Sequence, residues 1–342
     1  MSGTHPRDAL FEAGEVFRLL PVCDHYSGVE ARMRKSLELQ GKLGPVFDVT
    51  LDNEDGAPVG GEVDHARLIA ELITSPANLH GRVGARVLPV VHPRFESVVE
   101  TIVSGAGGSV AYLMIPKVRG LADLQRAVDL IDAATRSAGL QREIPLHALI
   151  ETHGALHEVF ALAAHRRIES LSFGLMDFVS AHRGAIPQTA MSVDGQFTHP
   201  LVVRAKTEIA AACHAHGKIP SHCVVTEFKR ASALQEAATK AARQFGYTRM
   251  WSIHPSQIEP IVEAFTPSAA EVDQAIEIIR AAETADWAPI RHDDTLHDRA
   301  SYRYFWQVIE RAHRTSYAGG LQLPEEIEAA WFGAQPPDTP AP

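Results

Sequence analysis

The stretch Val110–Glu151, VAYLMIPKVRGLADLQRAVDLIDAATRSAGLQREIPLHALIE, contains one full copy of the pattern that decides the fold. An apolar run at 110–118 is followed by an amphipathic segment at 121–139 and then by a second apolar run at 145–151. The two runs are apolar with little alternation, which predicts strands that are buried on both faces. The segment between them predicts a helix that ends at Gly139, since glycine is the usual residue just beyond a helix C-terminus.

This alternation of strand and helix extends over most of the chain and predicts eight β/α units in about 250 residues. The predicted strands are 16–22, 46–51, 85–91, 110–118, 145–151, 168–174, 219–226 and 248–254. The predicted helices are 28–42, 63–75, 94–107, 121–139, 154–166, 200–217, 230–246 and 256–265. Eight units favour a closed (β/α)8 TIM barrel over an open doubly wound sheet. No strand-to-helix turn carries the G-x-G-x-x-G motif of a Rossmann fold.

The chain continues beyond the eighth unit, and its pattern there changes from strand–helix alternation to helices alone. The predicted domains are a barrel at 1–267, a C-terminal helical extension at 268–334 and a disordered, Pro-rich tail at 335–342. The extension includes predicted helices at 268–287 and 300–320, and residues 302–306 include four aromatic side chains. Aromatic side chains at this density require burial, which we expect on the barrel or on a neighbouring subunit.

Composition excludes several classes of function. The net charge of −10 and the lack of a Lys/Arg block argue against nucleic-acid and anionic-membrane partners. The apolar runs are too short to cross a bilayer, and the N-terminus has no signal-peptide pattern, so we expect a cytoplasmic protein. The three cysteines, Cys23, Cys213 and Cys223, form no C-x-x-C pair and predict neither a disulfide framework nor a structural zinc site.

The ends of the predicted strands indicate where the chemistry takes place, because a TIM barrel holds its active site at the carboxyl ends of its strands. Glu151 ends the fifth predicted strand, and Asp177 follows the sixth. Carboxylates on adjacent strands are hard oxygen ligands, and Mg²⁺ commonly takes one or two of them. The pair therefore predicts a site for Mg²⁺, with Mn²⁺ as a possible substitute.

His153 and His157 offer a rival metal site, because residues four apart share one face of a helix. A zincin motif requires H-E-x-x-H, and the segment HGALH has no glutamate after its first histidine. We therefore interpret the pair as the polar start of an outer helix. His153 is two residues from Glu151 and is still expected to border the substrate pocket.

Other charged residues at strand ends are candidates for substrate contacts and catalysis. Glu54 and Asp55 follow the second predicted strand, and Arg86 lies in the third, where an unpaired guanidinium would be costly. Arg86 is predicted either to bind an anionic substrate group or to form a salt bridge within the barrel. Lys117 ends the fourth strand and is predicted to contact substrate. A Schiff-base role for Lys117 is less favoured, because no second cation in the sequence would lower its pKa.

Several segments together resemble the citrate lyase β-subunit-like branch of the HpcH/HpaI aldolase family, over about residues 16–282. The matching segments are RLLPVCDHYSGVEARMRKSLEL, VFDVTLDNEDG, ARVLPV, MIPKV, ALIETHGAL, LSFGLMDFVSAHRG and IHPSQIEPIVEAFTPSAAEVDQA. The resemblance implies a TIM barrel in which Glu151 and Asp177 bind Mg²⁺. It also implies that Arg86 faces the substrate and that Glu54 and Asp55 support the water shell of the metal.

The resemblance implies an activity as well, namely a carbon–carbon lyase for citryl-, malyl- or citramalyl-type thioesters. The products would be a 2-oxo acid and an acyl thioester on coenzyme A or an acyl carrier protein. A homotrimer or homohexamer is implied, in which the C-terminal segment caps the site of a neighbouring subunit. Two alternatives stay open: a class II pyruvate-type aldolase that acts on free hydroxy-oxo acids, and a barrel subunit without turnover.

Overall fold

The computed structural model describes residues 4–12, 19–227, 231–317 and 319–333. The chain divides into two compact units. The first comprises the described residues between 18 and 265, and the second comprises those of the segments 1–17 and 266–342. The predicted tail at 335–342 lies outside the described residues.

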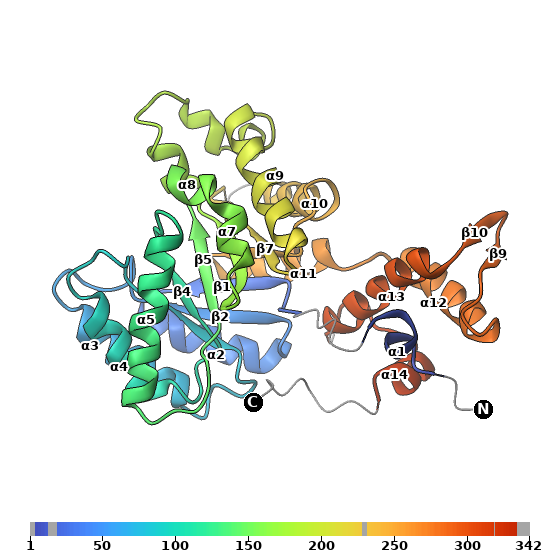
Figure 1. The fold of residues 1–342 in the computed structure, drawn as a ribbon, viewed down its shortest axis with the longest axis horizontal. Helices are drawn as coiled ribbons and strands as arrows, with labels where there is room; N and C mark the ends of the chain where they lie inside the picture. The colour runs from blue at the N-terminus through green and yellow to red at the C-terminus, as the bar shows by residue number, and fades with distance from the viewer. Residues whose placement is uncertain (1–3, 13–18, 228–230, 318, 334–342) are drawn as a thin grey trace. The chain divides into compact units, whose positions relative to one another are not determined.

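The first unit is a closed barrel of eight parallel strands, so the predicted TIM barrel is confirmed (Figure 1). Each strand pairs with the next one along the chain, and β8 closes the barrel by pairing with β1. The strands are β1 (Cys23–Ser27), β2 (Phe47–Asp52), β3 (Val83–Arg86), β4 (Leu113–Ile115), β5 (Leu146–Ile150), β6 (Ile168–Phe173), β7 (Ile219–His222) and β8 (Arg249–Ser252).

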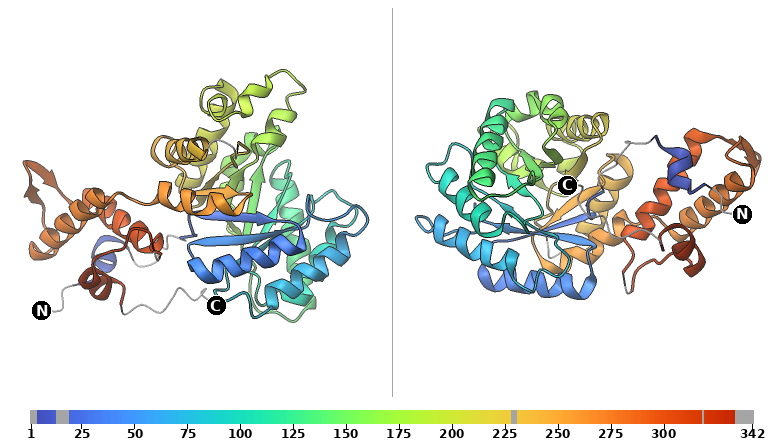
Figure 2. Two further views of the ribbon diagram at one scale, coloured as in Figure 1. Left: turned by 180° about the vertical axis from the view of Figure 1, so that it is seen from behind. Right: turned by 60° about the horizontal axis from the view of Figure 1, so that its bottom comes forward.

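Helices surround the strands on the outside of the barrel (Figure 2). They are α2 (Glu30–Leu43), α3 (Glu62–Thr74), α4 (Phe95–Ala106), α5 (Leu121–Ser137), α6 (His153–His157), α7 (Val159–Ala164), α8 (Leu175–Ser180), α9 (Pro200–Ala215), α10 (Ala231–Gln244) and α11 (Ile258–Phe265), with the 3₁₀ helices η1 (Gln188–Met191), η2 (Gly195–Phe197) and η3 (Pro255–Gln257). The predicted helix 154–166 is interrupted at Glu158, whose carboxylate accepts a hydrogen bond from the N–H of Leu121 at 2.6 Å.

The described helices include none with both the length and the apolar character needed to cross a membrane. The three cysteines are buried and free.

The position predicted for the first strand was wrong. Of residues 16–22, those from 19 onward are described and none is in a strand; β1 begins at Cys23. Strand β1 was missed because it contains Asp24 and His25, which are polar yet fully or almost fully buried. Asp24 can be buried because it accepts a hydrogen bond from Thr50 at 2.6 Å and pairs with a buried arginine of β8.

The third strand also differs from its prediction, since β3 ends at Arg86 instead of continuing to residue 91. Residues 87–90 are apolar and largely buried, but they form a loop after the strand. The strand instead begins at Val83 and includes Gly84, where an added Cβ would lie 2.4 Å from the Tyr112 ring. Arg86 therefore lies in the third strand, as predicted, and is its last residue.

At the opposite, amino ends of the strands lies a group of four charged side chains, of which three are fully buried and that of Arg82 is partly buried. Arg249 is fully buried and pairs with Asp48 at 2.6 Å and with Asp24 at 3.2 Å. Arg82 adds a second guanidinium, 2.7 Å from Asp48. Two cations thus face two anions, which is the balance that buried charges require.

The second unit is helical and has its own core. It contains α1 (Pro6–Leu10), α12 (Ala269–Thr284), α13 (Arg299–Arg314), α14 (Glu325–Trp331) and a short hairpin of β9 (Ile290–His292) and β10 (Thr295–His297). The helix predicted at 300–320 therefore ends earlier, at Arg314.

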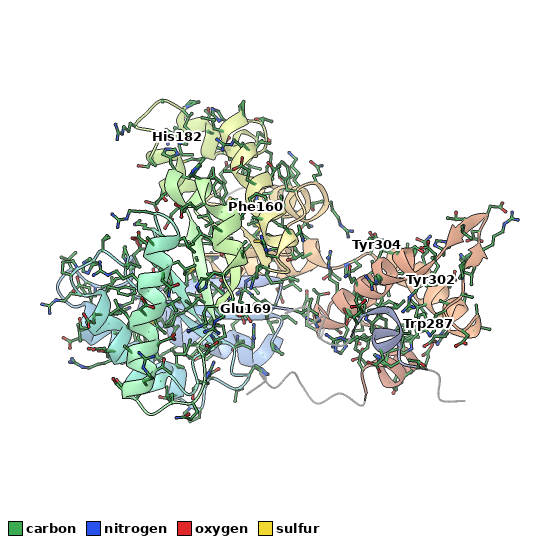
Figure 3. The ribbon with its side chains drawn as sticks, viewed as in Figure 1. Phe160, Glu169, His182, Trp287, Tyr302 and Tyr304 are labelled. Atoms are coloured by element: carbon green, nitrogen blue, oxygen red, sulfur yellow. The ribbon has the colours of Figure 1, made fainter. Side chains whose placement is uncertain are left out.

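The aromatic cluster at residues 302–306 is buried mainly in the core of this second unit. This location differs from the two that were predicted, the barrel and a neighbouring subunit. Tyr302 and Trp306 are fully or almost fully buried there, and Trp287 contacts Tyr302 edge-on (Figure 3). Leu10 of α1 joins the same core. Tyr304 is the exception, with 57% of its surface exposed.

We expect Gly84→Ala to lower the free energy of unfolding by about 2 kcal/mol, because the new methyl group would overlap the Tyr112 ring. That ring cannot shift easily, since its hydroxyl hydrogen-bonds Thr50 at 2.6 Å and its face stacks on His147. Gly108→Ala is the matched control, because a Cβ there has no neighbour within 4 Å. Urea unfolding followed by circular dichroism measures both variants, and equal losses would contradict the packing argument.

Candidate active site

A cavity of about 290 Å³ opens at the carboxyl ends of the barrel strands. Its lining has a charged side and an apolar side. The charged side is formed by Asp52, Asp55, Arg86, Glu151 and Asp177. The apolar side includes Tyr26, Phe173, Leu175, Met176, Val224, Trp251 and Ile253. A small molecule with an anionic end and an apolar end fits this division.

Arg86 is bound by three carboxylates at the edge of the cavity. Asp52 accepts two hydrogen bonds from the guanidinium, at 2.7 and 2.6 Å, and the oxygens of Glu54 and Asp55 each lie 2.8 Å from a guanidinium nitrogen. Burial opposes the charge of Arg86, but these carboxylates, Asp52 first, raise its pKa well above the ordinary value. Arg86 is therefore a fixed cation in the cavity wall.

Asp52 is a site residue that the sequence did not single out as functional. It is the last residue of β2, and the register of the barrel sets its Cα beside that of Arg86 in β3. Its position at a strand end, next to the predicted pair Glu54 and Asp55, was the available signal.

Lys117 connects the carboxylates of β2 with those of β5 and β6. Its ammonium lies 2.8 Å from Glu54 and 3.8 Å from Asp177, and its backbone N–H donates to Glu151 at 2.7 Å. The backbone adopts φ 50°, an uncommon value for a residue with a side chain. Burial lowers the pKa of Lys117, but the hydrogen bond and charge of Glu54 outweigh it and the pKa is raised. A cationic Lys117 disfavours the Schiff-base role.

Glu151 directly follows β5 and is almost fully buried. Burial, then the negative charges of Asp177 and Glu54, raise its pKa to about 8. Its carboxylate lies against the backbone of Gly174, where an added Cβ would be 2.3 Å from Glu151 Oε2. The only hydrogen bond that the described residues give its carboxylate comes from the N–H of Lys117. Glu151 is thus a buried carboxyl group that lacks a compensating cation of its own.

Asp177 lies in the first turn of α8, with 52% of its side chain exposed at the cavity. The structure therefore brings Glu151 and Asp177 to one cavity. Among the described residues, no group of three or more His, Cys, Asp or Glu side chains is arranged to hold a metal ion. Two carboxylates with open space beside them fit Mg²⁺, which takes most of its remaining ligands from water and substrate.

His153 is not among the residues that line the cavity. Its Nε2 lies 3.3 Å from the carbonyl oxygen of Ala181, and its ring packs against Phe178 and His182. The other histidine of the pair, His157, is exposed. The structure separates His153 from the charged residues that it brings together, namely Glu54, Asp55, Arg86, Lys117, Glu151 and Asp177.

The apolar side of the cavity was not predicted. Tyr26 of β1 and Trp251 of β8 stack with ring centroids 4.7 Å apart, and the guanidinium carbon of Arg86 lies 5.4 Å from the Tyr26 centroid. No local sequence pattern relates residues 26 and 251. Only the pairing of β1 with β8 brings them together.

Comparison with known proteins agrees with this geometry. The HpcH/HpaI aldolase/citrate lyase family model matches residues 46–255. A citrate lyase from Burkholderia xenovorans LB400 is 51% identical in sequence, with a TM-score of 0.83 over 96% of this chain and 100% of that one. The L-malyl-CoA/beta-methylmalyl-CoA lyase of Rhodobacter capsulatus is 30% identical over 200 residues, which are 56% of this chain and 62% of that protein. The chain thus spans less than two thirds of the length of that lyase.

A more distant structure shares the fold. Protein CitE from Mycobacterium tuberculosis, solved in complex with magnesium, acetoacetate and coenzyme A, is 19% identical, with a TM-score of 0.66 over 87% of this chain and 99% of that one.

The raised pKa of Glu151 predicts how the stability of the metal-free protein depends on pH. A folded-state pKa of about 8, above the ordinary 4.5, means that the folded state holds a proton which the unfolded state releases. The contribution of Glu151 to the free energy of unfolding therefore falls as the pH rises from about 4.5 through 8. A glutamine side chain cannot ionise, so the variant Glu151→Gln does not show this loss. The melting temperature of the variant minus that of the wild type should therefore be higher at pH 9 than at pH 5.

Thermal melts in a chelator at both pH values measure this difference. Glu38→Gln is the control, because that carboxylate is exposed and pairs with Lys35 on the surface. A difference between Glu151→Gln and the wild type that is the same at both pH values would show that Glu151 ionises normally.

Proposed function

Because the chain belongs to the HpcH/HpaI aldolase/citrate lyase family, we propose that it is a Mg²⁺-dependent carbon–carbon lyase. Its substrate is a hydroxyacyl thioester of citryl, malyl or citramalyl type, and its products are a 2-oxo acid and an acyl thioester. The observation that carries this proposal is the cavity lined by the buried Glu151, by Asp177, which lies 3.8 Å from Lys117, and by the fixed cation Arg86.

The residues proposed to hold Mg²⁺ are Glu151 and Asp177. They fit this ion for two reasons. Their carboxylates supply hard oxygen donors. In addition, Glu151 is buried beside the negative charge of Asp177 and lacks a compensating cation of its own. When bound, Mg²⁺ would polarise the oxygen of the 2-oxo or 2-hydroxy acid as a Lewis acid. Glu54 and Asp55 are proposed to support its water shell from the side of β2.

The two sides of the cavity orient the substrate. The acid portion lies toward Arg86 and the carboxylates, while the acyl portion lies against Tyr26, Val224 and Trp251. This direction avoids placing an apolar group against buried charges. His153 is not among the lining residues, and its proposed role is a substrate contact at the rim of the cavity.

Cleavage requires the loss of the substrate hydroxyl proton, followed by rupture of the adjacent carbon–carbon bond. The bonding electron pair passes to the acyl fragment, which becomes a thioester enolate and takes up a proton to give the acyl thioester. Arg86 stabilises the negative charge because its position is already fixed by Asp52 and Glu54. Lys117 is the second cation near this charge and is proposed to contact the substrate.

The acyl carrier is proposed to be coenzyme A or an acyl carrier protein. The lyase of Rhodobacter capsulatus, of which 62% is matched, is named for malyl-CoA substrates. This name supports coenzyme A as the acyl carrier. Assembly as a homotrimer or homohexamer and location in the cytoplasm stay predictions.

We expect Glu151→Gln and Asp177→Asn each to weaken Mg²⁺ binding at least about tenfold, because each removes one of two anionic ligands. Isothermal titration with Mg²⁺ measures the affinity, and circular dichroism confirms that the fold is kept. Asp129→Asn, on the outer face of α5, is the control and should bind like the wild type. Undiminished Mg²⁺ affinity in either cavity variant would refute the assignment of that ligand.

With Mg²⁺ present, we expect citramalyl-CoA or malyl-CoA to be cleaved with a kcat/KM at least about tenfold above that for free 4-hydroxy-2-oxo acids. The reason is that the apolar side of the cavity can bind an acyl portion which the free acids lack. Product analysis should give the 2-oxo acid and the acyl thioester in equal amounts, and Glu151→Gln should give neither. Cleavage of a free acid with both thioesters inert would instead favour the pyruvate-type aldolase.

A further inference from the structure

The three carboxylates around Arg86 differ sharply in exposure. The side chains of Asp52 and Glu54 are 8% and 7% exposed, whereas that of Asp55 is 74% exposed. Removing Asp52 from the guanidinium would leave a buried anion without its partner, which is costly, and removing Glu54 would leave a buried anion with Lys117 alone. The exposed carboxylate of Asp55 can move from Arg86 into water. The ion pair between Asp55 and Arg86 is therefore the one that another anion can replace.

The backbone on both sides of Asp55 is fixed. The carboxylate of Asp52 accepts a hydrogen bond from the N–H of Glu54 at 2.9 Å, which holds the turn before Asp55. After it, Gly56 lies so close to Gly28 that a Cβ added to Gly56 would be 2.4 Å from the Gly28 Cα. Rotation of the Asp55 side chain alone therefore frees one edge of Arg86.

The charges of the cavity explain why an exchange is needed. Arg86 and Lys117 supply two positive charges, against five carboxyl groups on Asp52, Glu54, Asp55, Glu151 and Asp177. With Mg²⁺ bound, four positive charges would face these five carboxylates, so a further anion would still meet a net negative charge. If it replaces Asp55 on Arg86, the number of carboxylates on the guanidinium stays the same.

We propose that the carboxylate of Asp55 occupies the position on the Arg86 guanidinium where a carboxylate of the substrate acid binds. When the acid binds, it displaces Asp55 from this position. This inference rests on the proposed function and specifies its substrate class: a carboxylate-bearing acid displaces Asp55, while a neutral carbonyl compound of the same size leaves it in place. The specificity for an acid then comes from an anion exchange on a fixed cation, with no backbone movement.

Asp55→Ala tests the exchange, with pyruvate as the probe and saturating Mg²⁺ present. Isothermal titration should show pyruvate binding about three- to tenfold tighter than in the wild type, because a competing ion pair of ordinary strength is gone. Asp55→Asn, which keeps the shape and loses the charge, should change the affinity in the same direction. Asp64→Ala is the matched control, since it removes an exposed aspartate of α3 that pairs with Arg67 outside the cavity.

Repeating the titrations at about 1 M salt separates direct exchange from a long-range field, because the Debye length is then about 3 Å. A gain that persists in Asp55→Ala supports exchange at Arg86, and a gain that disappears overturns it. If the wild type binds pyruvate and neither Asp55 variant binds it more tightly, the inference fails while the proposed function stands. If no form of the protein binds pyruvate with Mg²⁺, the proposed function fails as well.

Discussion

A guanidinium buried at the end of β3 is the constraint on which the site depends. Arg86 cannot remain unpaired there, and the barrel register sets Asp52 of β2 directly beside it. The loop after β2 adds Glu54, whose second oxygen is then available to Lys117 at 2.8 Å. Lys117 in turn donates its backbone N–H to Glu151. The buried guanidinium of Arg86 thus fixes the carboxylates of Asp52 and Glu54 directly, and it is connected to Glu151, after β5, through Lys117.

The two ends of the barrel differ in their balance of charge, and this difference supports the proposal that the cluster at the carboxyl ends is a site. At the amino ends, Arg82 and Arg249 face Asp24 and Asp48, so two cations balance two anions. At the carboxyl ends, two cations face five carboxyl groups, and burial, followed by the charges of Asp177 and Glu54, raises the pKa of Glu151. A cluster that only stabilised the fold would favour the balanced arrangement. The unbalanced one is suited to accept a divalent cation.

The sequence predicted the barrel, the strand that precedes Glu151 and the strand that precedes α8, where Asp177 lies, because apolar residues recur in each of these strands and an acidic residue follows it. It misplaced β1 because polar residues such as Asp24 find buried partners from distant strands, which no local pattern records. It misplaced β3 because residues 87–90 are apolar and buried without being in a strand. Burial predicts a strand only where the backbone also pairs.

The apolar side of the cavity depends on closure of the barrel. Tyr26 and Trp251 are 225 positions apart and stack only because β8 pairs with β1. The charged side, by contrast, comes from β2, β3, β5 and the start of α8. The acid and acyl portions of a substrate would therefore be bound by separate parts of the barrel. The two parts meet at Tyr26, whose ring centroid lies 5.4 Å from the guanidinium carbon of Arg86, so a substitution there would also act on the cation that holds the carboxylates.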